Sequence, residues 1–136
     1  MIKIIVNGLP PKKDGANSMW NKDLEADRLI SLRNEALNKI INKPLKKNLQ
    51  LNLKIYLKIN NKSQGDLDNF ITGICDGLMR AHDRAEISPK FNGFPKINPQ
   101  SVNFIEDDYK ILNINAKKII NRNLEKEYYE LEIIEI

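Results

Sequence analysis

The chain has 136 residues, of which 41% are hydrophobic and 29% charged, and its net charge is +4. This length suits one globular domain, so we expect a single domain over residues 1–136. No apolar run approaches the roughly 20 residues that a membrane span needs. A single cysteine excludes an internal disulfide framework and fits a reducing compartment. We therefore expect a cytoplasmic protein without a membrane partner.

The first half of the chain predicts a strand, a helix and a second strand. Residues 2–6 are mostly Ile and Val, and the strand ends before Pro10 and Pro11, which cannot donate to a ladder. From about residue 20 to 41, apolar residues recur at helical spacing. Over residues 49–59, apolar and polar side chains alternate, which predicts a long strand with one face toward a core.

The second half predicts a short helix, a long loop and two strands. Apolar residues form one stripe over residues 68–78, with Asp68 as the expected N-cap. Residues 80–104 lack periodicity and predict a long loop, with one helical turn near its start. Strands are expected over 109–117 and 128–136. The order strand, helix, strand, helix, strand, strand predicts an α+β fold, in which two helices pack on a mixed β-sheet.

Two acidic groups stand out along the chain. Asp66 and Asp68 lie at the start of the second helix, and Asp107 and Asp108 open the next strand. Such a cluster costs free energy while empty, because like charges repel, and a bound cation relieves that cost. Carboxylates without soft ligands favour Mg²⁺ or Mn²⁺, which can activate water against a phosphodiester. The alternative is structural, because an Asp at a helix start is usually a cap.

The charge distribution permits a nucleic-acid partner. The tail over residues 125–136 is acidic, so the rest of the chain is more basic than the net charge suggests. Many lysines precede Asp66. A basic surface attracts nucleic acid, although a solvated lysine-rich face explains the composition equally well.

The acidic motifs occur in an order that resembles a known nuclease family. The sequence GDLDN (65–69), the Asp76-Gly77-Leu78 segment and the Asp107-Asp108 pair are similar to those of the RusA-type Holliday junction resolvases, which are crossover junction endodeoxyribonucleases. The likeness covers nearly the whole chain, including the Pro-Pro pair after the first strand, Asn17 in the next loop and the basic strand before GDLDN.

This resemblance implies a RusA-like fold and a homodimeric, Mg²⁺-dependent endonuclease. Its substrate would be the Holliday junction or other branched DNA, in DNA recombination and repair. Asp66, Asp68 and Asp108 fall at the family's essential acidic positions, with Asp107 as a further metal ligand. The residues that we expect to contact DNA are Lys12, Lys13, Asn17, Lys62, Asn69, Arg80 and Lys110.

Two departures from the family keep alternatives open. Thr72 stands where the family often has a lysine, and Lys110, Lys62 or Arg80 could substitute for it. The segment over residues 80–103 is also longer than the family's, and it either grips DNA or forms a surface loop. The chain could therefore be a catalytically weak branched-DNA-binding protein of the same fold. It could also be a structural or interaction protein whose carboxylates only cap and turn.

Overall fold

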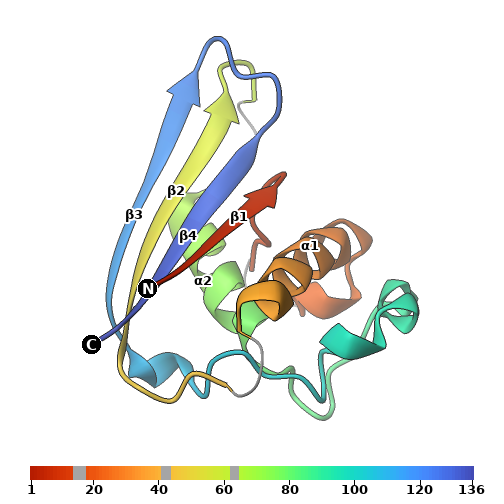
Figure 1. Ribbon diagram of the computed structural model, residues 1–136. Coiled ribbons are helices and arrows are strands. Elements are labelled where there is room, and N and C mark those ends of the chain that lie inside the picture. Colours follow the sequence, from red (N-terminus) through yellow and green to blue (C-terminus); the bar gives the residue numbers. More distant parts are fainter. Residues whose placement is uncertain (14–17, 41–43, 62–64) are drawn as a thin grey trace.

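The computed structural model describes residues 1–13, 18–40, 44–61 and 65–136. Within them the main elements are β1 (Ile2–Asn7), α1 (Asp23–Lys39), β2 (Leu49–Lys58), α2 (Leu67–Leu78), β3 (Ile111–Asn121) and β4 (Tyr128–Glu135), as Figure 1 shows. One-turn 3₁₀ helices lie at η1 (Met19–Asn21), η2 (Pro89–Gly93), η3 (Pro95–Ile97) and η4 (Asp108–Lys110). The predicted order and the α+β class are confirmed. No helix in these ranges is long and apolar enough to cross a membrane.

The four strands form one mixed sheet in the order β1-β4-β2-β3. β4 runs antiparallel to β1 and β2, whereas β2 and β3 are parallel. Parallel neighbours cannot be joined by a tight turn, so the chain between them crosses the sheet through α2 and the loop that follows. This crossover brings α2 and the segment before β3 to the same part of the molecule.

Both helices cover one face of the sheet. Figure 1 shows α2 behind β2 and β4, with α1 beside it near β1. Every second residue of β2 is buried, as the alternation predicts, and each such Leu or Ile contributes about 1.5–3 kcal/mol by leaving water. The core of the sheet and helices includes Leu51, Leu53, Ile55, Leu57, Leu32, Ala36, Phe70, Ile74 and Leu78.

Two predicted boundaries are wrong by a few residues. Trp20 lies in η1 and not in the long helix, because the extended backbone of Lys22 (φ −95°, ψ 125°) separates η1 from α1. The third strand begins at Ile111 and not at Tyr109, because Tyr109 belongs to η4, and the strand continues to Asn121 in register with β2. The predicted helix end at residue 41 lies outside the described residues.

The long loop after α2 is held by one buried arginine. Arg33 of α1 is 0% exposed, and its guanidinium lies 5.5 Å from the centroid of the Trp20 ring and 5.0 Å from that of Phe104. The guanidinium donates five hydrogen bonds of 2.6–3.2 Å to the main-chain carbonyls of Gly77, Met79, Ile97, Asn98 and Val102. The one-turn helices η2 and η3 lie in the middle of this loop, and near its start the chain makes a single turn, closed by a hydrogen bond from the N–H of Ala85 to the carbonyl of His82 (2.9 Å), and not a helix.

Candidate functional site

The predicted acidic motif lies at the start of α2. Asp66 is the N-cap, with extended backbone (φ −80°, ψ 148°), so the prediction that Asp68 caps the helix is wrong. The cap lies two residues earlier than predicted, and Leu67, the first residue of the helix, packs against the core. Asp68 lies in the first turn and accepts a hydrogen bond from the backbone N–H of Asn69 (3.1 Å). Both carboxylates are exposed, and the Asp66 side chain makes no capping hydrogen bond.

The middle of α2 is crossed closely by the chain after β1. A Cβ on Gly73 would lie 1.9 Å from the carbonyl oxygen of Pro11, so only glycine allows this crossing. The backbone N–H of Lys13 donates to the carbonyl of Asn69 (3.2 Å). The Lys13 ammonium donates to Oδ2 of Asp76 (2.7 Å). The crossing therefore places the backbone of Lys13 beside the first turn of the helix and its ammonium at the last turn.

The end of α2 is tied to the segment that leads into β3. The carbonyl of Leu78 accepts hydrogen bonds from the backbone N–H groups of Phe104 (2.9 Å) and Ile105 (3.3 Å). Ile105 also bridges to Leu45, just before β2. These contacts hold the next residues, Asp107 and Asp108, near the C-terminal end of the helix.

Asp107 and Asp108 begin a 3₁₀ turn and not a strand. The Asp107 carboxylate caps η4 by accepting from the backbone N–H of Tyr109 (3.4 Å). Hydrogen bonding to the Asp107 carboxyl raises the pKa of Asp108, and so do partial burial and the negative charges of Asp107 and Asp76. The Asp107 carboxyl is therefore the main cause of the raised pKa of Asp108, and the charge of Asp76, from another element, adds to it.

The thiol of Cys75 is affected by the same two carboxylates, Asp76 and Asp108. Cys75 is 8% exposed and belongs to the core, as its place on the apolar stripe predicts. Burial raises the pKa of Cys75 to about 12, and the charges of Asp76 and Asp108 add to the shift. The thiol therefore stays protonated near neutral pH, and the two carboxylates approach it from different elements.

The predicted metal ligands do not gather in one place within the chain. Asp76, Asp107 and Asp108 lie at the C-terminal end of α2, whereas Asp66 and Asp68 lie at its start. Eight residues of helix between Asp68 and Asp76 correspond to about 12 Å. Across the described ranges, no group of three or more His, Cys, Asp or Glu side chains could by itself hold a metal ion.

Asp76 is the acidic residue that the predicted ligand set lacks. Its signal in the sequence is its position on the polar face of α2, two turns after Asp68. Mg²⁺ in proteins is usually held by one or two carboxylates together with waters and substrate phosphates. Asp76 and Asp108 fit that requirement without a third carboxylate.

The expected DNA-contacting residues that the structure describes lie around α2. Lys12 passes Gly65 at the start of the helix, and its backbone N–H donates to the buried Glu25 (2.9 Å). Lys110 lies in η4 and not on a strand, with its ammonium 3.9 Å from a carboxylate oxygen of Glu106. Asn17 and Lys62 lie outside the described residues.

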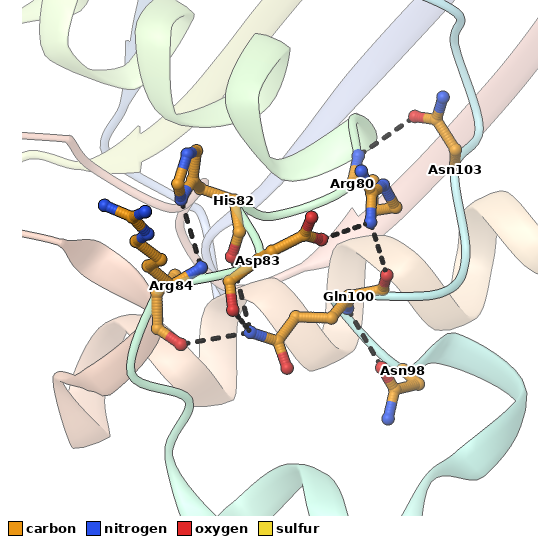
Figure 2. A network of polar contacts seen from close by, with 8 residues as sticks. Arg80, His82, Asp83, Arg84, Asn98, Gln100 and Asn103 are labelled. Atoms are coloured by element: carbon orange, nitrogen blue, oxygen red, sulfur yellow. Dashed lines mark hydrogen bonds and ion pairs between the residues drawn. The ribbon is translucent and has the colours of Figure 1, made fainter.

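Arg80 follows the helix and belongs to a network that shapes the start of the loop (Figure 2). Its guanidinium donates to Asp83 (2.6 Å) and to the carbonyl of Gln100 (3.1 Å). The Gln100 amide in turn lies 3.1–3.3 Å from the carbonyls of His82, Asp83 and Ala85. A hollow of about 320 Å³ lies here, lined by Lys13 and Asp76 together with Arg80 and His82. The basic side chains of Lys13, Arg80 and His82 therefore line the same hollow as the Asp76 carboxylate.

Comparison of the chain with protein-family models and with curated proteins finds no match. The relation to the RusA-type resolvases therefore remains a prediction from the order of the motifs.

Proposed function

We propose that this protein is a RusA-like, Mg²⁺-dependent endonuclease that cuts Holliday junctions or other branched DNA as a homodimer. The observation that carries the proposal is that the hydrogen bonds from Phe104 and Ile105 to Leu78 bring the Asp107-Asp108 pair toward the end of α2, where Asp76 lies. Neighbouring carboxylates disfavour the charged form of Asp108 there, and a cation would relieve that cost. Mn²⁺ could replace Mg²⁺, because both take oxygen ligands. Such an enzyme would act on DNA in the cytoplasm.

Each group around the end of α2 then has a role. A bound cation would supply an activated water and offset the charge that builds on the phosphodiester. Asp76 and Asp108 would hold the cation, and Lys13, 2.7 Å from Asp76, balances that carboxylate. Arg80 and His82 line the hollow beside Asp76 and would face the phosphate backbone. Asp66 and Asp68 enter the proposal through the resemblance, so they are the residues to test first.

A cleavage assay with a labelled four-way junction tests the proposal. We expect nicking that depends on Mg²⁺ or Mn²⁺ and a loss of nicking in Asp68→Asn, with junction binding kept or strengthened because phosphate repulsion falls. Asp23→Asn is the matched control, since Asp23 occupies the first turn of α1 as Asp68 does in α2. No nicking with either cation would overturn the proposal, and equal loss of binding and cleavage would make Asp68 structural.

The second candidate is a catalytically weak branched-DNA-binding protein. The observation that favours it is Thr72, whose hydroxyl donates to the carbonyl of Asp68 (3.0 Å) within the helix and carries no charge. Thr72→Lys separates the two candidates: a gain in cleavage of about tenfold or more would support the weak binder. Thr72→Met, similar in length but uncharged, is the control and should change nothing. A rate unaffected by lysine would favour an enzyme that uses another cation.

The third candidate, a structural or interaction protein, predicts no preference for branched over linear DNA. Under either DNA-binding candidate, affinity should fall steeply with salt because phosphate contacts release counterions. A gel-shift series over salt concentration, with junction and linear duplex of equal length, distinguishes these outcomes.

A further inference from the structure

β3 forms one edge of the sheet and is its longest strand, Ile111–Asn121 (Figure 1). It pairs with β2 on one side, and within the described ranges no strand pairs with its other side. The outward N–H and C=O groups of an edge strand are a ready template for pairing with another chain. The opposite edge, β1, has only six residues.

The side chains of β3 also lack a cover on the helix side of the sheet. Ile114 lies in register with Leu51 and Ile120 with Leu57, and both of these β2 residues are buried. In contrast, Ile114 is 37% exposed and Ile120 is 61% exposed. Leu112, also 61% exposed, lies at the point where the register between β2 and β3 shifts. β3 therefore continues the apolar face of β2 beyond the part that the helices bury.

The features that usually prevent an edge strand from pairing with another chain are few in β3. β3 contains no proline, and its two lysines are adjacent, Lys117 and Lys118. The Lys118 ammonium turns back to its own chain, where it donates to the carbonyl of Gly65 (2.5 Å). Lys117 lies beside Lys54 of β2 on the other face. In natural proteins, charged side chains often protect an edge strand from pairing. Of the two lysines of β3, Lys118 is bonded to Gly65 and is not available for that role.

We propose that β3 pairs antiparallel with β3 of a second copy, around a two-fold axis at Ala116. This register places Leu112 opposite Ile120 of the partner subunit, so the two most exposed apolar residues of the strand cover each other. It places Lys118 opposite the partner's Ile114, and Lys117 opposite the partner's Asn115, so no lysine faces a lysine. An axis at residue 117, or between 117 and 118, would oppose like charges, which destabilises a cross-strand pair.

A second copy of the same chain is the partner that the residues of β3 favour. A two-fold interface requires one surface to be complementary to itself, and this register meets that condition for both apolar and charged residues. The two four-stranded sheets would then join into one continuous sheet. The inference gives an interface to the homodimer of the proposed function, but its support is the strand alone.

The mass of the protein in solution tests the interface. We expect a dimer for the unmodified chain by sedimentation, and a monomer for the double variant Leu112→Lys/Ile120→Lys, in which lysines would face each other across both ends. Ile5→Lys on β1, where Ile5 is 52% exposed, is the matched control and should stay dimeric. Circular dichroism should show that all three chains are folded. A monomeric unmodified chain, or a double variant that stays dimeric, would overturn the proposal.

A disulfide tests the register independently. Directly opposite Cβ atoms in an antiparallel pair are about 4.5–5.5 Å apart, near the spacing that a disulfide bridges. Ala116→Cys should therefore give a covalent dimer under mild oxidation, whereas Asn113→Cys should not. The natural Cys75 is buried and should not react. Equal cross-linking of both variants would reject this register. A dimer that cuts no DNA would leave the interface standing and remove the proposed function. A monomer that cuts DNA would remove the interface and the homodimer of the proposed function, and would leave only the endonuclease activity.

Discussion

Two charged regions lie at the C-terminal end of α2: the buried guanidinium of Arg33 and a group of three carboxylates. They differ in how far neighbouring groups compensate their charge. On one side Arg33 is fully buried, and five main-chain carbonyls and two aromatic rings surround it. On the other side the carboxylates of Asp76, Asp107 and Asp108 lie near the surface, where Lys13 is the basic group paired with Asp76. One region satisfies its charge, whereas the other leaves like charges together.

The difference separates a charge that builds the fold from charges that we propose to hold a cation. Burial lowers the pKa of Arg33 to about 10, so the guanidinium stays protonated near neutral pH and keeps its hydrogen bonds. At the acidic region, the raised pKa of Asp108 shows that its charged form is disfavoured there. A charged group without enough partners adds nothing to folding, and that makes it a candidate for binding.

Removing the buried charge should have the largest effect on stability. Arg33→Met leaves five main-chain carbonyls without their donor, so we expect a loss of about 3–5 kcal/mol of unfolding free energy. Urea denaturation measures it. Arg84→Met, at an exposed position in the loop, should stay within about 0.5 kcal/mol. Similar midpoints for both variants would mean that water replaces Arg33 and that the loop does not depend on it.

The second largest loss of stability should come from a change at Gly73, where the Pro11 segment crosses α2. This crossing also brings Lys13 to Asp76. Gly73→Ala forces a Cβ against the Pro11 carbonyl, and we expect a loss of about 1–3 kcal/mol. Gly77→Ala should cost less, since its Cβ would meet the flexible ends of Leu29 and Leu32. Gly93→Ala has open space and is the control. An unchanged melting temperature for Gly73→Ala would show that the Pro11 segment can move away from α2.

The smallest effect on stability should come from the acidic region itself. Asp108→Asn removes a repelled charge near the surface, so we expect a change within about 0.5 kcal/mol. Mg²⁺ should raise the melting temperature of the unmodified protein, because a ligand that binds only the folded state stabilises it, and Asp108→Asn should lose that rise. Asp23→Asn should keep that rise. If Asp108→Asn also keeps it, the cation is held elsewhere and the contrast between the two regions fails.

The parts of the fold with local causes could be predicted from the sequence. The alternation over β2 and the apolar stripe of α2 each repeat often enough to define an element. Arg33 could not be predicted as buried, because its acceptors lie 44–69 residues further along the chain. Asp76 was part of the motif in the sequence, but its place near Asp108 could not be predicted for a similar reason. Its meeting with Asp108 depends on the hydrogen bonds that Leu78 accepts from Phe104 and Ile105, which no spacing in the sequence reveals.

The way in which Arg33 holds the loop also bears on how this protein can change during evolution. Its five acceptors are main-chain carbonyls, which every amino acid supplies. Substitutions at the exposed positions of residues 80–104 can therefore accumulate without loss of the anchor, as long as the number of residues and the path of the chain are kept. Insertions or deletions between Gly77 and Val102 would shift the carbonyls themselves. We expect relatives of this protein to conserve the length of the loop and the arginine more strictly than the loop's side chains.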